Sequence, residues 1–304
     1  MFIPTYQQAK QIAETNDQFY MKHDIVNDID VSHFGYKLPG FMDFAQPLGH
    51  DNVDAFEMRG ISYDHSTGLH SLMLRKFFSL NQTKGYMLDD LKSKKILYAQ
   101  DKIDGSLVRF MNINGEIVAK TKNSFQGIHC DIANSLVKNN PILAEQLMQS
   151  FEQRKAFIFE MVSPDNKIVI DYGDVTQLSL IQVRDEETGA YEDIRSYTNK
   201  GIMNASNMVS GINTWDDVMT FQQDVKDVEG LVLTLEDGSL VKAKTVWYDD
   251  MHDCVWEGNK TNKKLLKMCV NATIDDAVSM LSVDDPSREH MDTVYTKYSQ
   301  YVAA

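Results

Sequence analysis

The segment Lys102-Ile103-Asp104-Gly105-Ser106 could present a nucleophilic amine at the end of a strand. A lysine amine attacks phosphorus only when it is neutral, and the reference pKa of lysine is about 10.4, so nearby cations or burial must lower it. Lys242 and Lys244 stand two residues apart in a predicted strand and share one face, from which they could lower that pKa and hold a phosphate. The pattern indicates an enzyme that attaches a nucleotide to Lys102, although Lys-x-Asp-Gly alone also fits an ordinary hairpin turn.

Two carboxylates stand where such chemistry would need them. Glu160 lies in the apolar run 156–162, where a charged group is costly unless it has a partner. It could accept hydrogen bonds from a ribose hydroxyl or bind a metal ion, or it could pair with one of the lysines. Glu229 precedes Gly230 and another apolar run. Its oxygens suit Mg²⁺ held jointly with phosphate, although a strand-edge charge in solvent fits the same pattern.

Further cations occur upstream and between these segments. Arg59 precedes Gly60, Lys76 precedes two phenylalanines, and Lys120 and Lys122 share one face of a predicted strand. Together they could hold a triphosphate or the 5′-phosphate of an RNA, whereas each alone also fits a surface cation. The stretch from residue 92 to residue 122 contains seven Lys or Arg against three acids, which fits either a basic cleft or a solvated strand face.

The composition is that of a globular protein with a core of its own, since 43% of the 304 residues are hydrophobic and 24% are charged. The net charge of −14 argues against a protein that coats nucleic acid generally, but it permits a local basic groove. The three cysteines form no Cys-x-x-Cys pair and the eight histidines are dispersed, so we expect neither a disulfide framework nor a zinc site. No apolar run approaches a membrane span and the start lacks a secretory signal, so a cytoplasmic setting is expected.

Alternation, turns and capping residues predict the elements that would position these side chains. We expect two strands in 57–80, three in 96–122, more in 156–184 and a hairpin in 228–246. Helices are expected over 4–20, 125–138 and 141–153, the last with Asn140 as N-cap and Pro141 in its first turn. Beyond about residue 250 the pattern predicts only short helices, over 263–268, 274–281 and 286–301. We therefore expect an α+β protein with two units, 1–250 and a small helical unit, 251–304.

The order and content of these segments resemble the covalent nucleotidyltransferases, and within them the RNA ligase 1 family of T-even phages. The segment 102–108 is similar to the nucleotidyl-lysine motif of that superfamily, and the segments 159–164 with 168–172, 229–232, and 242–244 with 247–248 are similar to its later motifs. Upstream, the segments 58–61 and 75–81 resemble the leader of the RNA ligase 1 branch. The resemblance covers about residues 30–250, and it rests on the ordered set rather than on any single motif.

The resemblance implies a nucleotidyltransferase fold, with mainly antiparallel sheets flanked by helices and a small C-terminal helical domain. It implies an ATP-dependent RNA ligase that joins a 5′-phosphate to a 3′-hydroxyl, through lysyl-AMP and an adenylated RNA 5′ end, with Mg²⁺ or Mn²⁺ as cofactor. The implied partners are RNA ends, single-stranded or in a nicked tRNA, in RNA or tRNA repair by a monomer. For a phage protein the setting would be the host cytoplasm.

The resemblance also implies a role for individual residues. Lys102 would be the nucleophile, Glu160 would hold the ribose or a metal, and Glu229 would hold a metal or a phosphate-bound water. The phosphate contacts would come from five cations and the nucleotide would lie near one aromatic ring: Lys242 and Lys244 at the α-phosphate, Arg59, Lys76 and Lys122 at the outer phosphates, and Tyr36 beside the nucleotide.

Two departures from the family pattern and three alternative functions remain open. Ile103 stands where an acidic residue is common, and only about 55 residues follow the last motif, which puts a tRNA specificity in doubt. A capping guanylyltransferase or a DNA ligase would use related lysine motifs, but the leader at 58–81 and the lack of an evident OB-fold module after residue 250 count against both. A decayed ligase that only binds RNA ends is disfavoured because all five core residues, from Lys102 to Lys244, are present.

Overall fold

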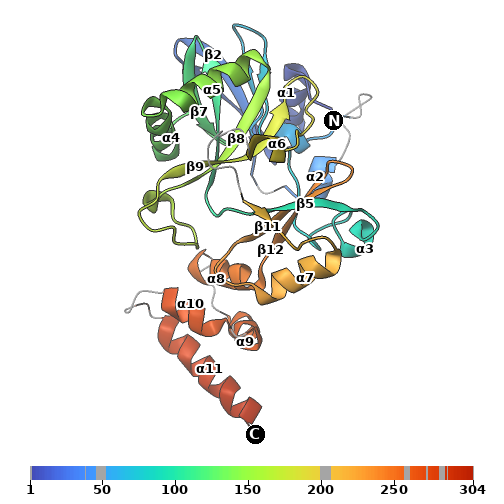
Figure 1. Cartoon of the computed structure of the whole chain (residues 1–304), viewed down its shortest axis with the longest axis vertical. Helices are drawn as coiled ribbons and strands as arrows, with labels where there is room; N and C mark the ends of the chain where they lie inside the picture. The colour runs from blue at the N-terminus through green and yellow to red at the C-terminus, as the bar shows by residue number, and fades with distance from the viewer. Residues whose placement is uncertain are drawn as a thin grey trace.

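The computed structural model describes residues 2–37, 39–45, 53–198, 207–256, 261–271, 273–280, 285 and 287–303. Within these residues, three four-stranded sheets form the body, and every neighbouring pair of strands is antiparallel. Helices lie against the sheets, and a group of C-terminal helices projects from one end of the molecule (Figure 1). No helix in this described part is both long and apolar enough to cross a membrane.

The first sheet contains the N-terminal part of the chain, with strand order β1-β2-β3-β4. Its elements are α1 (Tyr6–Thr15), β1 (Phe19–Val26), β2 (Ile29–Tyr36), α2 (Phe41–Ala45), η2 (Phe56–Met58), β3 (Ser62–Asp64) and β4 (His70–Ser71). The helix predicted over 4–20 ends at Thr15, because the chain turns at Asn16 and enters β1, where it pairs with β2. The two strands predicted within 57–80 are present but short.

The second sheet has the order β10-β5-β11-β12. Its elements are α3 (Leu88–Leu91), β5 (Ile96–Asp101), β10 (Met208–Val209), α7 (Trp215–Asp224), β11 (Gly230–Leu235) and β12 (Leu240–Lys244). The hairpin predicted over 228–246 is therefore present as β11 and β12. The segment before α3 extends this sheet, since Ser79 forms a parallel bridge with Lys242 and the Leu80 backbone N–H donates to the Lys242 carbonyl at 2.7 Å.

The third sheet has the order β7-β6-β8-β9 and carries two helices on one face. Its elements are β6 (Ser106–Ile113), β7 (Glu116–Thr121), α4 (Ile128–Lys138), α5 (Pro141–Glu152), β8 (Lys155–Val162), η3 (Pro164–Asn166), β9 (Gln177–Asp185) and α6 (Arg195–Thr198). The capping prediction for α5 is confirmed, because the Asn140 side chain accepts a hydrogen bond from the Leu143 N–H at 3.1 Å. Apolar residues of α4 and α5 pack on β6 and β8, which buries Phe110 and Phe159 completely.

The three strands predicted over 96–122 are confirmed, but their partition between sheets was not foreseen. The hairpin of β6 and β7 turns at Asn114-Gly115, both with positive φ. In contrast, β5 belongs to the second sheet and β6 to the third. The Asp104-Gly105 segment is therefore a crossover between two sheets, and the alternative of an ordinary hairpin turn there is wrong.

Two buried ion pairs attach the residues near η2 and β4 to the third sheet. Arg184 forms a bidentate pair with Glu57 at 2.7 and 2.9 Å, and Arg109 pairs with Glu186 at 2.8 Å. All four side chains are nearly inaccessible to solvent. Losing one partner of such a pair leaves a buried charge without compensation, which costs about 3–5 kcal/mol, so these pairs define the position of the chain just before Arg59.

The C-terminal helices share one apolar cluster. They are α8 (Val246–Trp256), α9 (Asn262–Val270), α10 (Ile274–Met280) and α11 (Ser287–Ala303). Tyr248 and Met251 of α8 pack with Leu265, Met268 and Met291, and Val169 from the segment before β9 completes the cluster. The three short helices predicted after residue 250 are present, although the predicted limits at residues 281 and 286 lie outside the described residues.

Candidate active site

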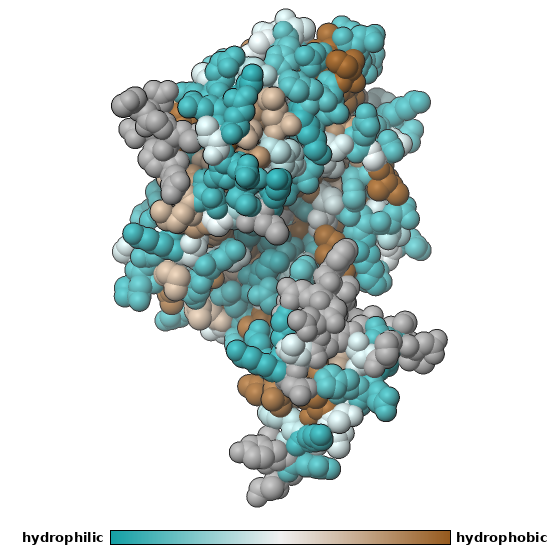
Figure 2. Space-filling model, turned by 180° about the vertical axis from the view of Figure 1, so that it is seen from behind, coloured by the Kyte–Doolittle hydropathy of each residue, from teal (hydrophilic) through white to brown (hydrophobic). Residues whose placement is uncertain are grey.

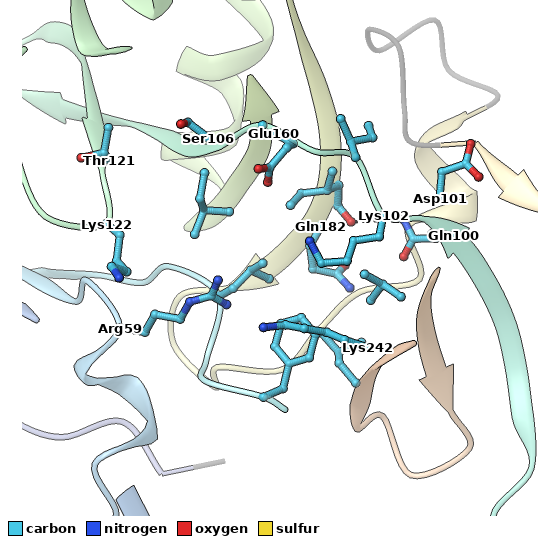
Figure 3. A pocket seen from close by; sticks show the side chains of 18 of the residues that line it. Arg59, Gln100, Asp101, Lys102, Ser106, Thr121, Lys122, Glu160, Gln182 and Lys242 are labelled. Carbon is cyan, nitrogen blue, oxygen red and sulfur yellow. Dashed lines mark hydrogen bonds between the residues drawn. The ribbon is translucent and has the colours of Figure 1, made fainter. Parts of the chain in front are cut away.

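A cavity of about 450 Å³ lies between the second and third sheets. Its lining combines cations, carboxylates and apolar residues, and Figure 3 shows the cationic side chains converging on it from separate elements. Lys102, Arg59, Lys122, Lys242 and Glu160 all face this space. The apolar part of the lining consists of Leu74, Phe77, Ile103, Leu107, Ile181, Val232 and Leu240. The site therefore offers both a charged and an apolar surface to a ligand, as expected of a small-molecule site.

Lys102 directly follows the last residue of β5, and it lies beside the beginning of β11. Its backbone N–H donates to the Gly230 carbonyl at 2.9 Å, just after the position where Asp101 pairs with Leu231. This pairing brings its amine to Glu229, whose carboxylate lies 2.6 Å from Lys102 Nζ and 3.3 Å from Lys244 Nζ. Glu229 is only 4% exposed, so the alternative of a strand-edge charge in solvent is wrong.

Asp104 anchors the crossover that carries Lys102. One carboxylate oxygen accepts hydrogen bonds from the Val169 and Ile170 N–H groups at 2.8 and 2.9 Å, and the other accepts from the Tyr248 hydroxyl at 2.6 Å. The Asp104 N–H in turn donates to the Tyr172 hydroxyl oxygen at 3.0 Å. A carboxylate with three donors is strongly fixed, so the chain after Lys102 is held to α8 and to the segment before β9.

Gly105 allows the crossover to pass close to β8. A Cβ atom at this position would overlap the Met161 carbonyl oxygen and lie 3.2 Å from Glu160 Cγ. The glycine is therefore required by this close approach, since the backbone here has no positive φ. It brings Lys102 and Glu160 to the same cavity although they belong to different sheets.

Arg59 and Lys242 form the cationic side of the cavity, and both stand over the ring of Phe77. The Arg59 guanidinium carbon lies 5.7 Å from the ring centroid and Lys242 Nζ lies 4.7 Å from it. Arg59 Nε and Nη1 are buried and have no hydrogen-bond partner. Buried donors of this kind normally find an acceptor, so Arg59 is equipped to bind an anion such as phosphate.

The charges in the cavity perturb one another. Burial, together with the neighbouring charges of Arg59 and Lys102, lowers the pKa of Lys242 to about 6. Burial also raises the pKa of Glu160 to about 7, with Lys102 opposing that shift and Glu229 adding to it. Both groups are therefore poised to gain charge when a ligand of the opposite charge enters.

Replacing Lys242 with methionine should stabilise the fold more at low pH than at high pH. The folded-state pKa of about 6 lies below the unfolded value of about 10.5, so below pH 6 the folded chain must carry a costly buried charge, and this cost declines as the pH rises between these values. We expect Lys242→Met to gain roughly 1–3 kcal/mol of unfolding free energy at pH 6 relative to the original chain, and less at pH 9. Urea unfolding of both chains at pH 6 and pH 9 measures this difference in unfolding free energy.

The exposed Lys138→Met change serves as the control, and it should show no such pH-dependent difference. An equal effect of Lys242→Met at pH 6 and pH 9 would contradict the account of a depressed lysine pKa.

Lys76 and Tyr36 lie beside the cavity and do not line it. Lys76 lines a smaller cavity of about 170 Å³ with Tyr86 and Tyr191. Lys122 Nζ lies 4.6 Å and Lys76 Nζ lies 5.6 Å from the centroid of the Tyr36 ring, so both lysines form cation–π contacts with this ring. Burial, with Arg59 and Lys122, lowers the pKa of Lys76 to about 8.

The basic stretch over residues 92–122 does not form one basic cleft. Lys92 and Lys94 are engaged with Asp89 and Asp237 at the surface. Arg109 is buried with Glu186, and Lys120 is buried and donates to the Gly60 carbonyl. Only Lys102 and Lys122 of the seven cations line the cavity, so Lys120 was wrongly grouped with the phosphate contacts.

Several lining residues had no role in the sequence prediction. Gln100 and Gln182 face the cavity from β5 and β9, and His129 faces it from α4. His129 Nε2 is hydrogen bonded to Asn166 Oδ1 at 2.8 Å, and Asn166 also accepts from Ser106. No motif marks these residues, because glutamine and histidine occur commonly on strands and helices, and only the meeting of the sheets places them here.

Comparison with known proteins agrees with this geometry. The sequence profile of the RNA ligase family, of the T4 RNA ligase 1 type, matches residues 57–251, which is more than half of the chain. A protein of Thermovibrio ammonificans described as a putative RNA ligase is 25% identical over 275 residues, which are 88% of this chain and 70% of that protein.

One of two solved structures extends the comparison to the fold. An archaeal ATP-dependent RNA ligase is 12% identical with a TM-score of 0.56, over 96% of this chain and 76% of the other. This likeness confirms the predicted α+β nucleotidyltransferase fold. A Naegleria gruberi RNA ligase mutant solved with ATP and Mn is 16% identical with a TM-score of 0.44, over 55% of this chain. The chain spans about half the length of that ligase, 53%.

Proposed function

This chain belongs to the RNA ligase family, and from that premise we propose that it uses ATP to join RNA 5′-phosphate and 3′-hydroxyl ends through lysyl-AMP at Lys102. The observation that carries the proposal is the position of the Lys102 amine. It faces a cavity in which Arg59 holds two buried donors without partners, and it lies 2.6 Å from the Glu229 carboxylate. An amine that faces an anion site and contacts a proton acceptor is what nucleotidyl transfer to lysine requires.

In the first step Lys102 Nζ attacks the α-phosphorus of ATP, a P–N bond forms, and the bond to pyrophosphate breaks. The amine must lose a proton, and the Glu229 carboxylate oxygen is the acceptor within reach. Lys242 and Arg59 would hold the phosphate oxygens as charge moves onto them. Because burial lowers the pKa of Lys242 to about 6, ATP binding near neutral pH should be accompanied by proton uptake at this lysine.

We assign the remaining contacts by their position relative to the cavity. Glu160 would accept hydrogen bonds from the ribose, since it faces the cavity from β8. Lys122 would contact the outer phosphates directly, while Lys76 and Tyr36 would orient Lys122 from behind the cavity wall. Lys244 would act on the α-phosphate through its shared partner Glu229. The apolar side of the lining suits the adenine base.

The second and third steps use the same groups. A 5′-phosphate oxygen of the RNA attacks the adenylate phosphorus, the P–N bond breaks, and Lys102 leaves as the amine. The 3′-hydroxyl then attacks the 5′-phosphorus of the adenylated RNA and AMP leaves. All three steps are in-line displacements at phosphorus, so one set of cations can stabilise the charge in each. The face shown in Figure 2 is mostly hydrophilic, and the net charge of the chain is −14. The cations of the cavity would therefore attract RNA phosphate against an acidic background.

Glu160, which lines the cavity, and Glu229, which contacts Lys102, would fit a divalent cation such as Mg²⁺ or Mn²⁺. Glu160 is a half-buried carboxylate whose raised pKa, about 7, reflects burial and the charge of Glu229, and a cation would relieve both. Mg²⁺ is commonly bound through one or two carboxylates together with substrate phosphates, and Glu160 and Glu229 supply that number. When bound, the ion would neutralise developing negative charge on the phosphates.

We propose the broader setting from the family and the domain organisation. Residues 1–250 would form the adenylyltransferase unit and residues 251–304 a small helical unit. The resemblance to phage ligases supports a monomer that acts in the cytoplasm on single-stranded or nicked RNA, in RNA or tRNA repair.

Incubation with α-labelled ATP and Mg²⁺, followed by denaturing electrophoresis, tests the proposal. We expect label on the protein with ATP and not with GTP, and transfer of that label to an RNA 5′ end in preference to DNA. Labelling by GTP would favour a capping guanylyltransferase, and transfer to DNA would favour a DNA ligase. Absence of any label on a folded chain that binds RNA ends would identify a decayed ligase.

Replacing Arg59 with methionine should weaken ATP binding without destabilising the fold. Two of its buried nitrogen atoms have no partner to lose, whereas a phosphate would lose charge-assisted hydrogen bonds. We expect the KM for ATP in self-adenylation to rise about 10–100-fold, since hydrogen bonds to charged groups contribute about 1.5–3 kcal/mol. Arg195→Met, an exposed arginine paired with Asp193, is the control. An unchanged KM, or a large loss of thermal stability, would show that Arg59 has a structural role instead.

A further inference from the structure

We propose that His23, Asp30 and His65 form a second metal site, specific for a transition metal such as Zn²⁺, on the surface of the first sheet. All three side chains are exposed, and none of them lines the cavity that contains Lys102. Each offers one ligand atom, and these atoms lie within 4.8 Å of one another. The site is separate from the proposed ligase function and does not depend on it.

Strand register assembles this group from distant positions in the sequence. His23 of β1 lies directly opposite Ser32 of β2, and Asp30 precedes Ser32 by two residues, so the three share one face of the hairpin. His65 follows β3, where Asp64 pairs with Val31, and its backbone N–H donates to the Asp30 carbonyl at 3.0 Å. The backbone positions of all three ligands are therefore fixed by sheet hydrogen bonds.

The side-chain atoms already converge around the Ser32 hydroxyl. Ser32 Oγ lies 3.0 Å from His23 Nδ1 and 2.7 Å from His65 Nε2, and His23 Nδ1 lies 3.6 Å from Asp30 Oδ1. Zinc binds imidazole nitrogen and carboxylate oxygen at about 2.0–2.2 Å, so ligand atoms around one tetrahedral ion lie roughly 3.5 Å apart. Small rotations of these exposed side chains would place the three atoms around a single ion, with a fourth position left for water or the Ser32 hydroxyl.

The ligand types decide which metal the group would take. Two imidazoles and one carboxylate suit Zn²⁺, Cu²⁺, Ni²⁺ and Co²⁺, whereas Mg²⁺ and Ca²⁺ prefer oxygen ligands throughout. A neighbouring ring also supports one of the ligands, since Tyr6 of α1 packs edge-on against His65 at a centroid distance of 4.9 Å. The His23 and His65 rings are stacked, with centroids 6.2 Å apart. From the sequence we expected no zinc site, because no suitable ligands lie close together along the chain. These two histidines are 42 positions apart, so their spacing gave no signal.

A bound ion would join the hairpin of β1 and β2 to the turn between β3 and β4. Such an ion binds the folded sheet, where the three ligands meet, and it finds no assembled site in the unfolded chain. Zn²⁺ should therefore raise the melting temperature in a concentration-dependent way. The site would therefore cross-link segments that lie before and after Arg59 in the sequence.

Calorimetric titration of the full chain with Zn²⁺, after treatment with chelator and without nucleotide, tests the proposal. The variants are His23→Ala, Asp30→Asn and His65→Ala, and the control is His290→Ala, which removes an exposed histidine of α11. The original chain and the control should bind one more Zn²⁺ than His23→Ala and His65→Ala, or bind it at least about 10-fold more tightly, and excess Mg²⁺ should not displace it. Asp30→Asn should weaken binding by a smaller factor.

Thermal unfolding and the absorption spectrum of bound Co²⁺ test the same site without counting the ions bound. Zn²⁺ should raise the melting temperature of the original chain and not that of His23→Ala, and the visible absorption of bound Co²⁺ should disappear in the same variant. Self-adenylation with ATP and Mg²⁺ should be unchanged in all variants, so this test does not depend on the outcome for the ligase. No binding at millimolar Zn²⁺, or equal binding by the original chain and both histidine variants, would overturn the proposal.

Discussion

Lys102→Ala will abolish transfer of label from α-labelled ATP to the protein. In the proposed mechanism the Lys102 amine forms the bond to phosphorus, and the other lysine amines near it are held elsewhere. Lys242 Nζ stands over the Phe77 ring, and Lys244 Nζ lies 3.3 Å from Glu229. Loss of a nucleophile removes the covalent route rather than slowing it, so we expect label below the level of detection. Gel electrophoresis under denaturing conditions is the measurement, and the labelled peptide of the original chain should contain Lys102.

A second substitution separates loss of the nucleophile from damage to the site. Lys102→Arg keeps a cation beside Glu229, which would otherwise be left with Lys244 as its ion-pair partner, so the fold and ATP binding should survive while labelling does not. Lys138→Ala, on the exposed side of α4, should label normally. Persistent lysyl-AMP in either Lys102 variant would show that another residue is the nucleophile, and the proposed mechanism would be wrong.

Glu229→Gln will lower the rate of self-adenylation by about 10²–10⁴-fold while the chain remains folded. In the resting chain the carboxylate holds both Lys102 and Lys244, and it is the group positioned to accept the proton that the attacking amine must lose. Glutamine keeps the size and one hydrogen-bond acceptor but carries no charge, so it orients the lysines poorly and accepts no proton. Single-turnover labelling with saturating ATP measures the step directly.

Two comparisons make the Glu229 result specific. Glu116→Gln changes an exposed glutamate of the hairpin between β6 and β7, and it should leave the rate unchanged. The rate of Glu229→Gln should rise when the pH is raised, because solvent then removes the amine proton that the carboxylate no longer accepts. If the substituted enzyme adenylates at the original rate, Glu229 is an ion-pair partner of structural value alone. If it unfolds, thermal unfolding will show it, and Glu229→Asp then tests the role of the charge.

The linear pattern predicted much of the local structure and most of the charged residues around the cavity. The α5 helix followed from Asn140 and Pro141, and the hairpin of β6 and β7 followed from its Asn-Gly turn, because these signals act within a few residues. The hairpin of β1 and β2 was missed although Asn27-Asp28 carries a comparable signal, with both residues at positive φ. There the helix pattern that begins the chain was extended too far.

The arrangement of the sheets could not be predicted in this way. Strand β5 pairs with β11, more than 130 positions later, and no local propensity identifies such a partner. The same limitation applies to Lys120, which shares a strand with Lys122 and yet is buried under the Gly60 carbonyl. Whether a lysine faces a cavity or the core depends on what packs above the strand, and that comes from the leader at residues 56–61.

Residue types and their order alone indicate the family to which the chain belongs. They also give the proposed nucleophile, Lys102, and the carboxylates and cations proposed to serve it, since this chemistry demands particular side chains in short segments. Folding adds the ion pair between Lys102 and Glu229, the anchoring of Asp104 by Tyr248, and the position of Tyr36 behind the cavity wall. It also brings His23 and His65 together. These contacts join residues far apart along the chain, and hydrogen bonds between strands and packing between sheets, rather than spacing in sequence, determine which of them meet.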